Sequence, residues 1–318
     1  MAEAAVPAPT PAAPVRPRRS LRAWLTRNPV VLKELRGRMR GPRAFVVLTT
    51  YLLLMSGFVT LLYVVYVASA NNVYSGPSSQ LIGKFVFGSV VGIELLLVCF
   101  IAPAFTAGAI SGEREHQTFD LLRTTLLSAS QLVLGKLASA LSYILLLLLA
   151  ALPLQSLAFL LGGVSPEEVL IATVLLVATA FLFGTSGVFF SSFMRRTLAS
   201  TVLTYAFALM ATLGFPLILL VLVSMSSFLF YNTSPGPITE ALLILGFWVL
   251  ISTNPIGTAI ATEYLLVVEQ TALIYQWPLQ SGATLPIISP WLPFVIFCSV
   301  LGSAMILASI LAVRRTER

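Results

Sequence analysis

Histidine, cysteine and carboxylate side chains perform most enzymatic chemistry, and few of them in this sequence are arranged to do so. The single histidine, His116, has neither a cysteine partner nor a His-Glu-x-x-His spacing around it, so no zinc site is indicated. Cys99 and Cys298 lie in apolar runs, where cysteine behaves as a small buried hydrophobe. Gly135 and Lys136 lack the other residues of a phosphate-binding loop. The sequence therefore predicts a chain that is not an enzyme and that itself binds no metal, nucleotide or other cofactor.

One ionisable side chain lies deep inside an apolar run: Glu94, in the stretch VGIELLLV. A carboxylate in hydrocarbon is costly, and it commonly faces a cavity or pairs with a group on another helix. Two interpretations remain open, namely structural pairing with a neighbouring helix and a place in a transport pathway. A lone glutamate does not make a proton relay.

The elements that carry these residues are those of a membrane protein. Of the 318 residues, 58% are hydrophobic and only 10% are charged, against roughly 25% charged residues in an ordinary soluble domain. The mean hydropathy is +0.95. The apolar runs are near 20 residues or longer, which suits membrane helices and not the alternating strands of a barrel. We therefore expect an all-α, multi-pass protein of the inner (cytoplasmic) membrane.

Basic residues are distributed unevenly along the chain. Ten of the 19 Lys and Arg residues precede Ala44, none lies between Arg196 and Arg314, and the chain ends in RRTER. Because basic residues in short flanking loops stay in the cytoplasm, this pattern predicts cytoplasmic termini and six spans. It also accounts for the net charge of +7 without a nucleic-acid partner. The predicted spans cover about 44–68, 85–109, 133–164, 169–190, 198–223 and 291–313.

The chain begins with two segments that precede the membrane spans. Residues 1–20 are rich in Ala and Pro, which predicts a disordered tail. Residues 21–41 form a predicted elbow helix at the cytoplasmic interface, with Leu35 on one face and Lys33 and Arg36 on another. This helix either only anchors the first span or also contributes to contact with a partner protein.

Residues 42–318 form the predicted transmembrane domain. One part of this domain lacks apolar runs long enough to cross a membrane. The segment 224–290 holds two apolar stretches that are short for crossing a membrane. One extra crossing would put the terminal arginines outside. We therefore expect outward-facing or re-entrant helices there, the second beginning at Asn254 and Pro255.

Charged residues near the predicted outer ends of the spans have local explanations. Lys84 is the one basic residue predicted outside, and its long side chain can reach lipid headgroups from the end of its span. Ser165, Pro166 and Glu168 have the spacing of a capping box with proline at the first helical position. These residues predict a helix start and no acidic binding site.

The segment 111–131 holds the densest cluster of charge outside the N-terminus. Ser111 can cap a helix, and the two glutamates that follow favour its positive N-terminal end. Phe119 and Leu122 fall at helical spacing. We expect an amphipathic helix at the cytoplasmic face that joins spans two and three. It is either an interfacial connector or a contact surface for a protein, and acidic residues suit an anionic leaflet poorly, which favours the protein.

The sequence resembles the ABC-2 type permeases, the membrane subunits of ATP-binding-cassette transporters. The resemblance rests on NPVVLKELRGRMR before the first span, on GEREHQTFDLLRTTLLSASQLVLGKL between spans two and three, and on six spans over essentially the whole chain after the tail. The loop of that family carries an acidic Glu-Arg-Glu run, a Thr, an apolar pair, a second Thr and a Gly-Lys pair. Here these are Glu113 to Glu115, Thr118, Leu121 with Leu122, Thr125, and Gly135 with Lys136. Two positions depart from the pattern, because Gln117 stands where glycine is common and Leu126 where proline is frequent.

The resemblance implies that segment 111–131 is a coupling helix seated in a groove of a separate ATPase subunit, with the elbow helix beside it. ATP and Mg²⁺ would bind in the ATPase dimer, whose closure would switch the spans between inward and outward access. Two permease copies would enclose the pathway, since six spans make half of such a transporter, and export is the implied direction. The implied interface residues are Lys33, Glu34, Arg36, Glu113, Arg114, Glu115, Thr118, Phe119 and Leu122.

Two other classes of function remain open. A secondary transporter would use Glu94 as a proton site, but no inverted repeats or broken midplane helices are detectable in the sequence. A membrane scaffold, or an enzyme acting on lipid, would need no ATPase partner. If the chain is a transporter, the few polar residues in its spans favour an amphiphile, a lipid or a hydrophobic drug over a sugar or a metal ion.

Overall fold

The computed structural model describes residues 42–70, 79–118, 128–230, 236–279 and 282–316. The predicted tail and elbow helix, with Lys33, Glu34 and Arg36, lie outside the described residues. The same is true of Phe119 and Leu122 in the charged segment.

Within the described part of the chain, six helical segments are long and apolar enough to cross a membrane. This confirms the predicted all-α architecture with about six candidate spans, and each observed segment overlaps its predicted counterpart. The bent pair Pro237–Ile251 and Pro255–Val267 passes the same test only when its helices are taken together, which would make seven. Five are single helices: α3 (Pro42–Ala70), α4 (Ser79–Thr106), α7 (Ala129–Leu161), α8 (Pro166–Phe193) and α13 (Trp291–Thr316). The sixth runs through α9 (Thr197–Leu209), the π-helical turn η1 (Met210–Gly214) and α10 (Phe215–Leu229).

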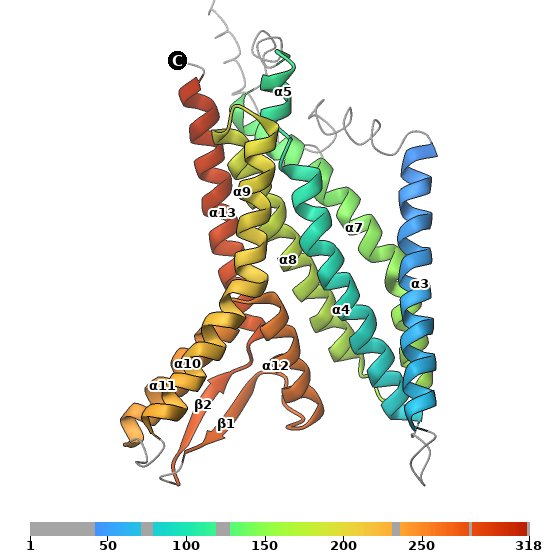
Figure 1. The fold of residues 1–318 in the computed structure, drawn as a ribbon, viewed down its shortest axis with the longest axis vertical. Helices are drawn as coiled ribbons and strands as arrows, with labels where there is room; N and C mark the ends of the chain where they lie inside the picture. The colour runs from blue at the N-terminus through green and yellow to red at the C-terminus, as the bar shows by residue number, and fades with distance from the viewer. Residues whose placement is uncertain (1–41, 71–78, 119–127, 231–235, 280–281, 317–318) are drawn as a thin grey trace, which may run out of the picture.

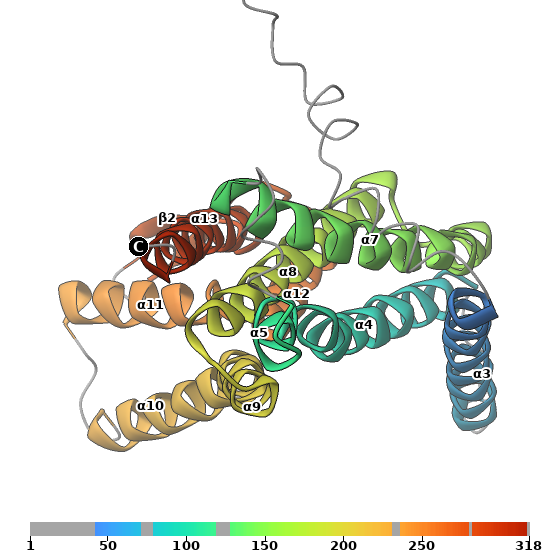
Figure 2. The same ribbon diagram turned by 90° about the horizontal axis from the view of Figure 1, so that it is seen from above.

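Helix α8 lies at the centre of the bundle. It packs along α13 and α4 and also contacts α7 and α9 (Figure 2). In its most apolar stretch 67% of the residues are buried, against 11% in α3, which lies at the edge of the bundle. Gly187 of α8 permits the close approach of α8 to α4, because a Cβ added there would clash with the side chain of Thr106 at the end of α4. This packing fixes α4 against α8 just before the charged segment begins.

The π-helical turn η1 is stabilised by a residue from another helix. It ends directly before Phe215 and Pro216, and proline lacks the N–H that a regular helix would use there. Asn254 donates from Nδ2 to the backbone oxygens of Ala211 and Thr212, at 2.6 and 3.0 Å. The buried Asn254 side chain thus supplies hydrogen bonds to carbonyl groups within the widened turn.

Within the segment 224–290, whose apolar stretches are short for crossing a membrane, two helices form a bent pair: α11 (Pro237–Ile251) and α12 (Pro255–Val267). Their axes bend by 116° at the break between them. As the sequence predicts, Asn254 caps α12, accepting a hydrogen bond from Gly257 N at 2.6 Å, and Pro255 follows at the first helical position. Both helices lie in the half of the molecule away from the C-terminus (Figure 1).

A two-stranded antiparallel hairpin follows α12, and the sequence analysis missed it. It consists of β1 (Ile274–Pro278) and β2 (Thr284–Ile288), with Tyr275 opposite Ile287. Trp248 of α11 donates from its ring N–H to Ile288 O at 2.7 Å, and its ring meets that of Trp277 edge to face. The hairpin is therefore attached to α11 by both hydrogen bonding and aromatic packing.

The start of α8 differs from the predicted capping box. Ser165 does accept a hydrogen bond from Glu168 N, at 3.2 Å, and Pro166 is the first helical residue. The Glu168 carboxylate does not return to the Ser165 backbone, however, and lies 4.0 Å from Lys84 Nζ of α4. Lys84 and Glu168 are thus cross-helix neighbours. The reciprocal half of the predicted capping box was wrong, the predicted helix start at Ser165 and Pro166 is confirmed, and the headgroup contact of Lys84 stays a prediction.

Candidate coupling site

A short helix, α5 (Ser111–Glu115), follows α4 after a four-residue turn. It projects at the end of the molecule that also holds the C-terminus (Figure 1). The predicted cap at Ser111 was wrong, because Ser111 is a fully buried residue of the helix and donates to Ala107 O at 3.3 Å. Ser191 of α8 provides the cap, and its Oγ accepts from the backbone N–H groups of Ile110 and Ser111 at 2.8 and 2.9 Å. The start of α5 is therefore fixed to α8.

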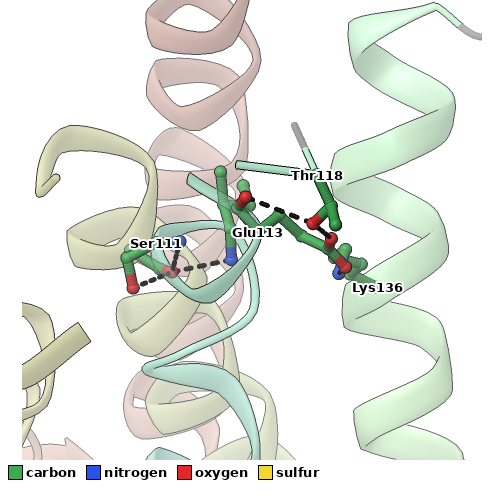
Figure 3. Close-up of polar contacts among 6 residues, drawn as sticks. Ser111, Glu113, Thr118 and Lys136 are labelled. Carbon is green, nitrogen blue, oxygen red and sulfur yellow. Dashed lines mark hydrogen bonds and ion pairs between the residues drawn. The ribbon is translucent and has the colours of Figure 1, made fainter. Parts of the chain in front are cut away.

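Glu113 of α5 pairs with Lys136 of α7, a residue 23 positions later in the chain. Lys136 Nζ lies 2.8 Å from Glu113 Oε1, and Thr118 donates its hydroxyl to the other carboxylate oxygen (Figure 3). The Lys136 side chain is only 7% exposed and that of Glu113 30%. A nearly buried ammonium in this position needs a partner, and Glu113 provides it. This contact connects α5 to α7.

Arg114 and Glu115 contact the connection between α8 and α9. Arg114 donates from Nη1 to Met194 O at 3.3 Å, and Glu115 Oε2 accepts from Thr197 N at 3.1 Å. Arg196, at the N-cap position of α9, makes no side-chain cap. Because Thr197 begins α9, the Glu115 carboxylate takes over that capping role from outside the helix.

Helix α5 ends abruptly, so the expected continuous helix from Ser111 toward Phe119 and Leu122 was wrong. Gln117 has a φ of 57°, in the left-handed region that glycine adopts most readily. Gln117 N donates to Arg114 O and Thr118 N to Glu113 O, at 3.2 and 2.9 Å, the bonds of a Schellman helix end. Gln117, which stands where the ABC-2 permeases commonly have glycine, thus adopts a backbone conformation that glycine adopts most readily.

The structure brings together four of the sequence-predicted interface residues: Glu113, Arg114, Glu115 and Thr118. Their charged and hydroxyl groups contact α7 and the chain leading into α9, where the sequence analysis expected them to face a partner. The residues exposed beyond them are His116 and Gln117. Sequence reasoning missed Ser191 and the pairing of Lys136, although the Gly-Lys pair in the resembling motif was a signal for the latter.

Glu94 lies apart from this cluster, in the middle of α4, and is 1% exposed. Its Oε2 accepts a hydrogen bond from Gln155 Nε2 of α7 at 2.8 Å. The contact agrees with the structural-pairing interpretation, while a place in the transport pathway stays a prediction. Within the described ranges, no group of three His, Cys, Asp or Glu side chains is placed to hold a metal ion.

Comparison with known proteins places this architecture in a family. No curated protein sequence matches the chain significantly. The family described as ABC-2 family transporter protein matches residues 29–309, a range that includes every described helix from α3 to α12 and most of α13. Because the match extends over most of the sequence, this chain belongs to the ABC-2 family of transporter membrane components, which are permeases and not catalysts.

Proposed function

We propose that this chain is the membrane-spanning subunit of an ABC exporter and that a separate ATPase dimer drives it by docking on α5. The carrying observation is the attachment of α5 to other helices at several points: to α8 through Ser191, to α7 through Glu113 and Lys136, and toward α9 through Glu115. A force applied to α5 would therefore move the spans together instead of bending a loose connector. ATP and Mg²⁺ bind in the partner, whose presence family membership implies.

In this proposal the α5 end of the molecule faces the cytoplasm. Helix α5 and the end of α13, with Arg314 and Arg315 in its last turn, lie at the same end (Figure 1). The connection that carries Arg195 and Arg196 meets α5 there, through Met194. Concentration of basic residues at one end of the spans supports a cytoplasmic location by the positive-inside rule.

The opposite end would then face outward. Helices α11 and α12 lie in that half, and the sharp bend between them supports a re-entrant pair over an additional crossing. This arrangement keeps both ends of the spanning domain on the cytoplasmic side. A second permease copy, identical or related, completes the pathway, since six spans correspond to half of such a transporter.

Site-directed cross-linking tests this proposal. Both native cysteines, Cys99 and Cys298, are buried, so a single introduced cysteine carries the label. Gln117→Cys places it on the exposed end of α5, and Glu167→Cys places it on an exposed residue at the opposite end of the spans. Each variant is co-expressed with the cognate ATPase and receives a photoactivatable maleimide.

We expect light-dependent cross-linking to the ATPase from position 117 and none from position 167. A membrane-impermeant maleimide should label position 167 in intact cells and position 117 only after permeabilisation. The purified permease alone should bind no ATP. Cross-linking from position 167 alone, or transport driven by a proton gradient without an ATPase, would contradict the proposal, and the latter would favour a secondary transporter.

A further inference from the structure

A cleft of about 460 Å³ lies between α4, α8 and α12, in the part of the molecule away from α5. Its volume is within the range of roughly 300–1,000 Å³ that is typical of small-molecule sites. Most of the lining is aliphatic or aromatic, and includes Phe87, Val91, Leu95, Leu175, Ala259 and Leu266. Such a lining favours an alkyl chain or another apolar body.

The same cleft is lined by two carboxylates and a hydroxyl. Glu168 of α8 and Glu263 and Thr262 of α12 all contribute to it. Glu168 is 6% exposed and Thr262 2%, yet Glu168 Oε2 and Thr262 Oγ1 are buried without a hydrogen-bond partner. Buried polar atoms are nearly always hydrogen-bonded in proteins, so these two atoms lack a donor or acceptor that a ligand could supply.

The charge in this corner of the cleft is unbalanced. Lys84 is the basic group near the two carboxylates, and Glu263 lies within electrostatic range of both Glu168 and Lys84. With both carboxylates ionised, two negative charges and one positive charge leave a net charge of −1. The Lys84 to Glu168 separation of 4.0 Å is too long for a hydrogen bond, so Lys84 does not satisfy the carboxylate.

These features together select one class of ligand. The uncompensated negative charge favours a monocation and disfavours an anionic lipid headgroup. Two carboxylates and a hydroxyl supply fewer oxygen ligands than the six to eight that Ca²⁺ takes, and a net charge of −1 matches a monocation better than a divalent metal ion. The unpartnered Glu168 oxygen accepts hydrogen bonds only, so a head with N–H donors suits it better than a quaternary ammonium.

We propose that the cleft between α4, α8 and α12 is a binding site for a primary alkylammonium amphiphile. The ammonium head contacts Glu168, Glu263 and Thr262, and the alkyl body lies along the aliphatic lining. This inference goes beyond the exporter proposal, because binding here needs neither ATP nor the ATPase subunit. The same chemistry is offered by free long-chain amines and by the amine of an aminolipid.

Two glycines allow the cleft to be filled without disturbing the fold. Gly88 and Gly92 of α4 both line it, and a Cβ added at either position meets no atom within 4 Å. A leucine at position 88 would therefore occupy space that the alkyl chain needs. Gly57 of α3, where an added Cβ also meets nothing, is the matched control outside the cleft.

The test measures equilibrium binding of radiolabelled dodecylamine to the full-length permease in phosphatidylcholine nanodiscs near pH 7, with empty nanodiscs subtracted. The amine is protonated there, since alkylamines of this kind have a pKa of about 10. We expect saturable binding, weaker binding of dodecyltrimethylammonium, and still weaker binding of dodecanol. Glu168→Gln and Glu263→Gln should each lower the affinity for dodecylamine by about tenfold or more, the effect of one charge-assisted contact.

The controls separate the site from general effects on the protein or membrane. Glu167→Gln removes an exposed carboxylate beside Glu168 and should leave binding unchanged, as should Gly57→Leu. Gly88→Leu should abolish saturable binding while the protein keeps its elution volume and unfolding temperature. Equal affinity for dodecanol and dodecylamine, or unchanged binding in both glutamine variants and in Gly88→Leu, would overturn the proposal.

A last arm identifies the source of the amine. Phosphatidylethanolamine is added to the nanodiscs as a competitor. Displacement of dodecylamine supports the site with a lipid amine as its natural occupant, and retention supports it with a free amphiphile. The result is independent of ATPase cross-linking, so this inference and the exporter proposal can fail separately.

Discussion

The two ends of this molecule treat their charges differently. At the α5 end, Glu113 forms a hydrogen-bonded ion pair with Lys136 at 2.8 Å, and Glu115 caps α9. At the other end, Glu168 lies 4.0 Å from Lys84, and one of its buried oxygens makes no hydrogen bond. Satisfied charges hold helices together, whereas an unsatisfied carboxylate retains the ability to bind an external cation. The comparison thus distinguishes the α5 end, where charge pairs hold helices together, from the cleft, where a carboxylate oxygen is available to a ligand.

Glu94, in the middle of the bundle, lies between the two ends, and its substitution should have the largest effect on stability. It tests whether a polar partner matters most where water is excluded. Glu94→Lys should destabilise the protein by about 3 kcal/mol, the cost of a lysine at the centre of a membrane helix, and should reduce the yield of folded protein. Glu94→Gln keeps a polar group that can bond Gln155 and should behave like the parent. Size-exclusion profiles and thermal unfolding in detergent measure both variants. A stable, well-assembled Glu94→Lys protein would show that this position faces water.

The direct comparison of the two ends comes from removing one lysine at each. Lys136→Met removes the hydrogen-bonded ion pair with Glu113 and should destabilise the protein by about 2 kcal/mol, as expected for the loss of a hydrogen bond to a charged group. Lys84→Met should cost less than Lys136→Met, because Lys84 lies 4.0 Å from Glu168 and the substitution breaks no hydrogen bond. It should also strengthen dodecylamine binding, since it removes the local positive charge. Equal losses of stability in the two variants would remove the distinction between the ends.

The smallest effect is expected at the end of α5. Gln117→Gly relieves a left-handed backbone conformation and should stabilise the protein by about 1 kcal/mol. Gln80→Gly, on an exposed residue of the first turn of α4 without such a backbone, should not stabilise. Thermal unfolding of the two variants in the same detergent makes the comparison. If Gln117→Gly destabilises, the Schellman end does not form as described.

Much of the fold could be predicted from sequence because its signals are local. Long apolar runs and clustered arginines depend only on neighbouring residues, and they gave the six spans. Asn254 and Pro255 marked a helix start for the same reason. The hairpin was missed because its strands have five residues each and both contain proline, which weakens a strand signal.

The candidate sites were harder to predict because their contacts join distant parts of the chain. Nothing in the sequence around Ser191 indicates that it caps α5, 80 positions away. Gln155 was a polar residue in a predicted span, and its position could have suggested a partner for Glu94. Glu168 had a sufficient local explanation in the capping pattern, and only the packing of α4 against α8 brings Lys84 to it.

The central claim is that the ion pair between Glu113 and Lys136 makes α5 a rigid transmitter between the ATPase and the spans. The most direct test is stimulation of ATP hydrolysis by transport substrate in proteoliposomes that contain permease and ATPase, with the amount of bound ATPase measured in parallel. Lys136→Met should keep ATPase binding but lose stimulation and transport. The exchange Glu113→Lys with Lys136→Glu should restore part of both, and Glu167→Gln should resemble the parent. Full stimulation and transport by Lys136→Met would contradict the account.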